Sequence, residues 1–123
     1  MLSVRKLTAE TVGDVRLMAD AVLIGAGKLG QALCGYSGFS AYGLNILAAF
    51  DISVQNPQTV DGKAYLPMED LKDFCHDNKI LMGIITVPAA SAQQVCDKMI
   101  DSGIKAIWNF APVHLDVPEH ILV

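Results

Sequence analysis

The stretch "AVLIGAGKLGQAL", residues 21–33, decides how this chain folds. Its first four residues form an apolar run, as expected of a strand buried on both faces of a sheet. Gly25, Gly27 and Gly30 follow at the spacing G-x-G-x-x-G, and the apolar positions from Lys28 to Gly35 repeat as they do in a helix. The stretch therefore predicts a strand, a glycine turn and a helix, an arrangement that can cradle a pyrophosphate.

The rest of the chain alternates strand-like and helix-like segments. We expect strands at 44–51, 63–65, 80–87 and 106–110, helices at 68–78 and 89–102, turns at 61–62 and 116–119, and the start of a last strand at 121–123. This order produces a parallel sheet with right-handed crossovers. The predicted fold class is α/β: a Rossmann-like, doubly wound, mostly parallel sheet with helices on both faces.

Each expected helix has one apolar face that should lie against the sheet. Cys34, Cys75 and Cys96 fall on inward helix positions, where cysteine behaves as a small buried hydrophobe. Trp108 is expected to belong to the core. The other predicted inward residues are Leu29, Ala32 and Leu33 in the first helix, Leu71 and Phe74 in the second, and Ala92, Val95 and Met99 in the third.

The size and composition of the chain fit one globular domain. Of its 123 residues, 52% are hydrophobic, which is enough for a full core. Residues 1–20 lack a clean apolar period, so we expect an N-terminal arm there and the domain at 21–123. The longest apolar stretch, 80–90, is shorter than the roughly 20 residues of a membrane span. No apolar segment of a secretory signal follows Arg5 and Lys6.

Charge and cysteine content argue against two kinds of function, nucleic-acid binding and metal binding. The net charge is −4, with nine Lys and Arg against thirteen acids and no basic cluster. Such a chain is by itself a poor candidate for nucleic-acid contact, which usually needs a basic face. The three cysteines are widely spaced and form no metal-binding pattern, so we expect no metal site, reduced thiols and a cytoplasmic location.

Asp51 indicates which ligand the glycine turn would bind. It closes the second predicted strand, 21 residues after Gly30, where a carboxylate accepts hydrogen bonds from the ribose hydroxyls of an adenosine. The same carboxylate repels a 2′-phosphate, and the stretch "DISVQN", residues 51–56, offers no arginine to accommodate one. The pattern therefore favours NAD(H) over NADP(H). It also favours a dinucleotide site over a glycine-rich turn that binds nothing.

Two further segments follow predicted strands and so reach the same sheet edge. In "ITVPAA", residues 85–90, Thr86 is a candidate hydrogen-bond partner for ribose or phosphate and Pro88 for packing on adenine; a strand end with a proline stop explains the segment equally well. In "WNFAPVHL", residues 108–115, Asn109 supplies a polar group, and Phe110, Pro112 and Val113 supply apolar walls. His76, His114 and His120 lack partners at informative spacing, so we assign no acid–base role.

Three segments together resemble the NAD(H)-binding domain of the Rex family of redox-sensing transcriptional repressors. They are "VLIGAGKLGQALCGYSGFSAYGLNILAAFD", "GKAYLPMEDL" and "GIITVPAASAQQVCDKMIDSGIKAIWNFAPVHLDVPEHILV". The parts "AAFD" and "NFAPVHLDVPE" are more specific than the glycine motif. The resemblance implies a bacterial cytoplasmic homodimer that reads the NADH/NAD+ ratio, in which NADH closes the two subunits and releases operator DNA.

The resemblance also implies a set of NAD(H)-binding residues. The pyrophosphate would lie on Gly25, Ala26, Gly27, Lys28, Leu29 and Gly30; the adenosine half on Asp51, Ile52, Thr86, Val87 and Pro88; and the nicotinamide end on Asn109, Phe110, Ala111, Pro112 and Val113. Rex proteins also carry an N-terminal winged-helix domain and a C-terminal helix swapped between subunits. We expect both to be absent here, so that operator DNA is contacted only through a missing domain.

Two other functions compete with a non-catalytic sensor. One is a CoA-binding domain like that of succinyl-CoA synthetase, which shares the "VP" after a strand but has a different glycine turn and usually lacks an acid like Asp51. The other is a small NAD-dependent oxidoreductase. It is disfavoured because the chain has too few residues for a substrate domain and no paired acid–base group.

Overall fold

The computed structural model of the chain describes residues 19–25, 27–36, 38–39, 43–60 and 62–123. Most of the expected N-terminal arm, and Asp61 of the expected turn, lie outside the described residues. Ala19 and Asp20, which we assigned to the arm, already belong to the first strand. Within the described part of the chain, no helix is long and apolar enough to cross a membrane.

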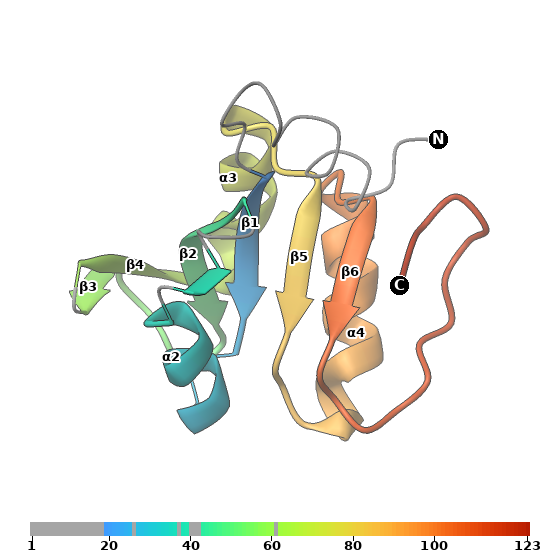
Figure 1. The fold of residues 1–123 in the computed structure, drawn as a ribbon, viewed down its shortest axis with the longest axis horizontal. Helices are drawn as coiled ribbons and strands as arrows, with labels where there is room; N and C mark the ends of the chain where they lie inside the picture. Colours follow the sequence, from blue (N-terminus) through green and yellow to red (C-terminus); the bar gives the residue numbers. More distant parts are fainter. Residues whose placement is uncertain (1–18, 26, 37, 40–42, 61) are drawn as a thin grey trace.

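The fold is built on one six-stranded sheet with the order β3-β4-β2-β1-β5-β6 (Figure 1). Five strands are parallel, and only β3, at the edge beside β4, runs antiparallel. This arrangement confirms the predicted mostly parallel α/β sheet. The strands are β1 (Ala19–Ile24), β2 (Leu44–Asp51), β3 (Gln58–Val60), β4 (Lys63–Pro67), β5 (Met82–Ile85) and β6 (Ala106–Asn109).

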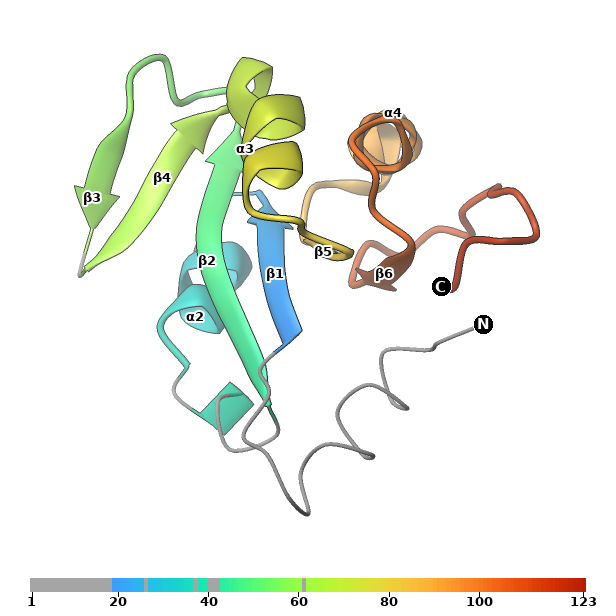
Figure 2. The ribbon, with the colours of Figure 1, turned by 90° about the horizontal axis from the view of Figure 1, so that it is seen from above.

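Helices cover both faces of the sheet, as predicted (Figure 2). One face carries α3 (Leu71–Asp77) and α4 (Ala89–Asp101), and the opposite face carries α2 (Lys28–Cys34). A 3-10 turn, η2 (Met68–Asp70), precedes α3. The helix predicted over 68–78 is therefore split, because Pro67 ends β4 and the chain tightens before the α-helix begins.

The strand order reverses at the centre of the sheet. From β1 the chain adds β2 and β4 on one side, then crosses to add β5 and β6 on the other. In the register of the sheet, Ile24 at the end of β1 lies between Phe50 of β2 and Ile85 of β5. The carboxyl ends of these three strands thus meet at a topological switch point, where open α/β sheets bind their ligands.

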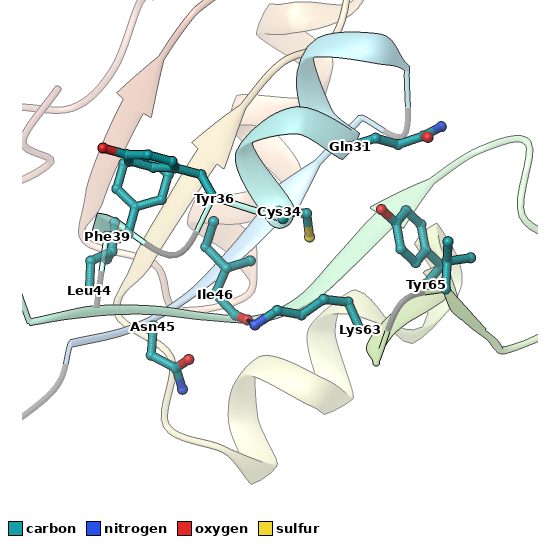
Figure 3. Close-up of a pocket in the computed structure, with 11 residues that line it drawn as sticks. Gln31, Cys34, Tyr36, Phe39, Leu44, Asn45, Ile46, Lys63 and Tyr65 are labelled. Carbon is teal, nitrogen blue, oxygen red and sulfur yellow. Dashed lines mark hydrogen bonds between the residues drawn. The ribbon is translucent and has the colours of Figure 1, made fainter. Parts of the chain in front are cut away.

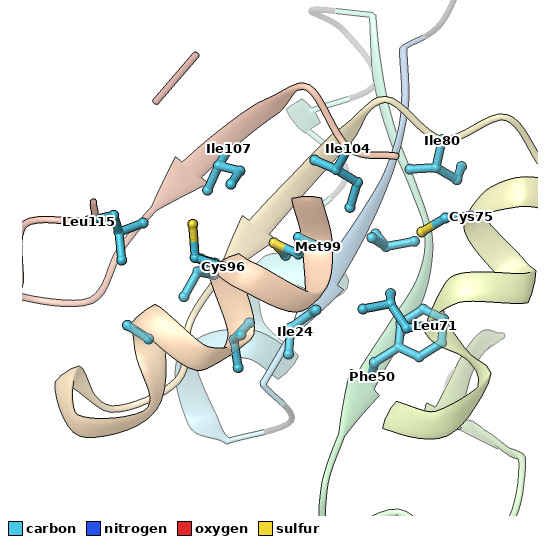
Figure 4. Packing of buried hydrophobic residues seen from close by; sticks show 14 of the residues in the cluster. Ile24, Phe50, Leu71, Cys75, Ile80, Cys96, Met99, Ile104, Ile107 and Leu115 are labelled. Carbon is cyan, nitrogen blue, oxygen red and sulfur yellow. The ribbon is translucent and has the colours of Figure 1, made fainter. Parts of the chain in front are cut away.

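Alternate residues of the strands fill two apolar layers. Ile24 and Phe50 point to the face covered by α3 and α4, where they pack with Leu71 and with the fully buried Met99 (Figure 4). A Cβ at Gly83 would lie 2.7 Å from the Met99 methyl carbon, so the glycine in β5 leaves the volume that Met99 occupies. The predicted inward faces of α3 and α4 are all buried or packed against this layer.

Helix α2 buries only part of its predicted inward face: Cys34 is buried as predicted, but Leu29 and Ala32 are not. Its buried residues are Gly30 and Cys34, whereas Leu29 is 46% exposed, Ala32 is exposed and Leu33 is half-buried. The helix is only seven residues long, and the glycine, having no side chain, is what allows it to approach the sheet closely. The apolar pattern of such a short helix did not predict that Gly30, rather than a larger apolar residue, would face the sheet.

Trp108 is not a core residue, contrary to the prediction. Its side chain is 41% exposed, because β6 is the outermost strand and α2 lies over the other end of the sheet. The indole packs edge-on against Phe39, with ring centroids 5.7 Å apart, and lies 5.2 Å from the ring of Phe110. Trp108 follows the buried Ile107, so its side chain points to the opposite face of β6. A strand residue on that face is buried only where a helix covers it.

Other element boundaries also differ from the prediction. The strand expected over 80–87 is shortened to β5, and the one expected over 63–65 extends to Pro67. The edge strand β3 has three exposed residues, of which only Val60 is apolar, so the sequence pattern did not reveal it. The last strand expected at 121–123 is a single bridge between Leu122 and Ala106.

All three cysteines are buried free thiols, as predicted. Burial raises the pKa of the Cys75 thiol to about 11 and also raises the pKa of Cys96. The fold favours the neutral thiol. Its contribution to the free energy of unfolding is therefore fully present below the thiol pKa of the unfolded chain, and it is lost as the pH rises through the thiol pKa of the folded chain.

We expect the Cys75 thiol to react with a thiol reagent at pH 8 about 100-fold more slowly in the folded chain than in urea, because burial suppresses both thiolate and access. Mass mapping of the labelled peptides measures this rate for each cysteine. Equal labelling of Cys75 in the folded and the unfolded chain would show that α3 does not seal the core.

Candidate functional site

The glycine turn begins at Gly25, directly after β1. Its φ of +121° is one that side-chain-bearing residues rarely adopt, and a Cβ there would overlap the Thr86 hydroxyl. Its N–H donates to the Phe50 carbonyl oxygen over 2.8 Å. Conformation and packing therefore both require glycine at this position.

Gly30 and Gly27 are glycines for different reasons. A Cβ on Gly30 would overlap the carbonyl oxygen of Gly25, so the first turn of α2 rests directly on the end of β1. Gly27, the residue before α2, has an ordinary φ of −75°, and no described atom lies within 4 Å of a Cβ built there. The packing of the described chain therefore does not require glycine at Gly27, and the backbone there is open to close approach.

Of the remaining turn residues predicted to bind a pyrophosphate, the two that the structure describes are exposed. Lys28 and Leu29 begin α2 and are exposed beside Gly27, and Ala26 lies outside the described residues. An exposed lysine at the start of this helix can also contact an anionic ligand.

Thr86 ties the glycine turn to the neighbouring strand. Its hydroxyl lies 3.1 Å from the Ile24 carbonyl oxygen and 3.2 Å from that of Gly25, and its own N–H donates to Ile24 over 2.9 Å. The single hydroxyl hydrogen is therefore used within the protein, where we had expected it to reach ribose or phosphate. In this structure, Thr86 positions the turn.

A cavity of about 300 Å³ opens at the carboxyl edge of the sheet. Asp51 and Ile52 line it from the end of β2, and Val87 and Pro88 line it from the segment after β5. The structure thus brings together four residues that we had predicted for the adenosine half. The Asp51 carboxylate accepts the Ser53 N–H over 2.8 Å, which shapes the turn after the strand.

Sequence reasoning missed part of this cavity. Met68 of η2 and Ser91, Gln94, Val95 and Lys98 of α4 also line it. The only available signal was that α4 starts directly after Pro88, which places its first turns beside the same sheet edge. The cavity as a whole is mostly apolar, and Asp51 and Lys98 are its charged groups.

The loop predicted for the nicotinamide end is held by Asn109. The Asn109 side chain accepts the Ala111 N–H and donates to the Val113 carbonyl oxygen, both over 2.9 Å. The Phe110 N–H donates to the Ile85 carbonyl oxygen over 2.9 Å, so the loop is attached to the end of β5. The Asn109 amide therefore shapes this loop.

This loop does not share the cavity that Asp51 lines. Phe110 is 36% exposed and Val113 is 39% exposed, Pro112 is exposed, and Ala111 is buried. Asn109 and Val113 line a separate hollow of about 570 Å³ beside β6. Outside the glycine turn, the predicted site residues thus form two groups along one sheet edge, one around Asp51 at the end of β2 and one around Asn109 at the end of β6.

The described residues contain no group of three or more His, Cys, Asp or Glu that could hold a metal ion. They also contain no buried polar or charged residue. The groups that this edge presents are the Asp51 carboxylate, the Lys98 ammonium, the backbone of the glycine turn and apolar walls.

Comparison with known proteins identifies the class. A family model for the CoA binding domain matches residues 18–113, and the chain belongs to this family. It is 44% identical over 108 residues to the redox-sensing transcriptional repressor Rex of Clostridium perfringens (strain SM101 / Type A), covering 85% of this chain and 50% of that protein. The predicted resemblance to Rex repressors is thereby confirmed.

Solved structures agree. The crystal structure of RSP in complex with beta-NADH matches with a TM-score of 0.79 and 37% identity, over 85% of this chain and 51% of that one. RSP in complex with beta-NAD+ and operator DNA matches with a TM-score of 0.81 and 35% identity, over 90% and 52%. The chain spans about half the length of these relatives.

The two glycines of the turn offer a matched test. We expect Gly30→Ala to lower the free energy of unfolding by about 1–3 kcal/mol, because its Cβ meets backbone that cannot move away. Gly27→Ala, with open space beside it, should change it by less than about 0.5 kcal/mol. Urea unfolding measures both, and an equal cost at the two positions would contradict the described packing.

Proposed function

We propose that the chain is the NAD(H)-binding domain of a redox-sensing transcriptional repressor, which responds to the NADH/NAD+ ratio. The observation that carries this proposal is the cavity at the switch point, where Asp51 and Ile52 face Val87 and Pro88 beside the glycine turn. The relative RSP has been solved with beta-NADH and with beta-NAD+ and operator DNA, which supports the same ligand for this chain.

The residues at the edge fit the parts of a dinucleotide. The Asp51 carboxylate would accept from the ribose hydroxyls, and adenine would pack between Ile52 and Pro88. The open space beside Gly27 would take the pyrophosphate. Because this space borders the end of β1, the ligand would continue from the Asp51 cavity towards the loop after β6.

The loop after β6 would receive the nicotinamide. The bound dinucleotide supplies a ring that is neutral when reduced and positively charged when oxidised. Phe110 and Val113 present exposed apolar side chains there, and an apolar wall favours the neutral ring, since a charged one loses more hydration on contact. Asn109 would act by holding the loop in place.

We propose that the domain is not an enzyme. A hydride-transfer enzyme usually needs a positioned proton donor beside the nicotinamide. Among the described residues no polar or charged side chain is buried, and the Asn109 amide is engaged by its own loop. The similar proteins are named as repressors, which agrees with a sensing role.

Operator contact and assembly belong to the whole repressor in this proposal. With a net charge of −4, the chain itself offers little attraction to DNA phosphates. We therefore assign operator binding to the half of the relatives that this chain does not match, and we propose a cytoplasmic homodimer as the working form.

CoA binding is the alternative that one observation favours, since the matching family model is that of the CoA binding domain. CoA carries a phosphate on its adenosine ribose, and Asp51 would repel it at the position where it would accept from the hydroxyls of NADH. The acid at the end of β2 therefore favours NADH.

A thermal-unfolding comparison of NADH, NAD+, NADPH and CoA at one concentration separates these functions. We expect NADH to raise the melting temperature most, because a ligand at 100 times its Kd stabilises by about 2.7 kcal/mol. NADPH and CoA should raise it least, since both carry a phosphate that Asp51 repels. Stabilisation by CoA without stabilisation by NADH would make the CoA alternative correct.

Asp51→Asn tests the ribose contact. Asparagine keeps an oxygen for the Ser53 N–H but lacks the charge, so we expect NADH to bind at least about tenfold more weakly and the preference over NADPH to shrink. Calorimetry measures both affinities, with Asp101→Asn at the exposed end of α4 as the control. Unchanged NADH affinity in the Asp51 variant would refute the assignment.

A further inference from the structure

A second cavity lies on the α2 face of the sheet, away from the carboxyl edge (Figure 3). It measures about 340 Å³ and is enclosed by the end of α2, the start of β2 and the β3–β4 hairpin. On β2 it is lined by residues up to Ile46, five positions before Asp51. At roughly 3.3 Å per residue that is about 16 Å along the strand, so this cavity is separate from the proposed dinucleotide site.

Lys63 brings a positive charge to this cavity. Its ammonium group donates one hydrogen bond to the Ile46 carbonyl oxygen over 2.8 Å. An ammonium carries three N–H donors, and no ion pair joins Lys63 to a carboxylate in the part of the chain that the structure describes. A half-buried cation that has no carboxylate partner among the described residues is stabilised when a bound anion shares its remaining donors.

Cys34 lines the same cavity as Lys63. The thiol is 5% exposed and lines the same wall. Burial raises the pKa of Cys34, while the charge of Lys63 and a hydrogen bond with Tyr65 partly oppose that rise. Lys63 from β4 and Cys34 from the end of α2 thus border one cavity.

Aromatic and aliphatic side chains form the opposite part of the lining. The rings of Tyr36 and Phe39 meet edge to face, with centroids 5.0 Å apart. Figure 3 shows these two rings together on one side of the cavity, with Lys63 reaching in from the β4 side. Leu44 and Ile46 add an aliphatic floor from β2.

We propose that this cavity is a second ligand site, which binds a small carboxylate with an aromatic or apolar body. Lys63 would take the carboxylate, and Tyr36, Phe39 and Leu44 would take the body. The volume of about 340 Å³ lies at the lower end of the roughly 300–1,000 Å³ of small-molecule pockets, so it has room for one ring with a short acid chain.

Amide NMR spectra of the chain test this site, with phenylacetate as the probe and neutral phenylacetamide as its isostere. We expect millimolar phenylacetate to shift the signals of Cys34, Gly35 and Asn45 saturably, and phenylacetamide to bind about tenfold more weakly, because it lacks the charge that Lys63 recognises. Shifts confined to Gly27 and Asp51 would place the probe at the other site and overturn the proposal.

Variants of Lys63 separate recognition from general damage to the fold. Lys63→Gln should abolish the preference for the acid over the amide, and Lys63→Arg should keep it, because the arginine retains the charge. Lys105→Gln, an exposed lysine before β6, is the matched control and should leave binding unchanged. Equal phenylacetate affinity in the wild type and Lys63→Gln, or no saturable binding at all, would refute the site.

Discussion

The contact between Gly30 and the Gly25 carbonyl oxygen is the constraint on which the rest of the site depends. It leaves no room for a side chain, so the first turn of α2 lies against the end of β1. The Thr86 hydroxyl, between the carbonyls of Ile24 and Gly25, ties the same turn to the end of β5. Backbone groups at the switch point are thereby held in place before any ligand arrives, which lowers the entropy cost of binding.

The ends of rigid strands carry the proposed recognition. Asp51 and Ile52 leave β2, and Val87 and Pro88 leave β5, so two strands that are not neighbours place their ends on opposite sides of one cavity, with β1 between them. The loop after β6 is less buried but is fixed by both ends of the Asn109 amide and by the Phe110 N–H. A sensor needs a rigid site, because a site that adapts to both the oxidised and the reduced form of one ligand binds the two with similar affinity.

The proposed recognition uses the Asp51 carboxylate in one cavity, which Lys98 also lines, and the Lys63 ammonium in the other. Asp51 lies at the carboxyl edge, where a ligand with free hydroxyls suits a carboxylate and a ligand with an extra phosphate does not. Lys63 lies on the α2 face, where an acid suits the ammonium. Helix α2 connects them, since it begins beside Gly27 and ends at Cys34, on the wall of the second cavity.

The sequence by itself determined the alternation of strands and helices, the glycine turn and the acid at the end of β2. These are local properties: a positive φ demands glycine, a buried strand demands an apolar run, and a period of 3.6 marks a helix. Only the tertiary structure decided that the Thr86 hydroxyl serves the turn, that Trp108 is exposed, that α4 completes the Asp51 cavity and that Lys63 meets Ile46. Each of these depends on which strands become neighbours and on which face a helix leaves uncovered, and residues that meet across such distances leave no periodic signal along the chain.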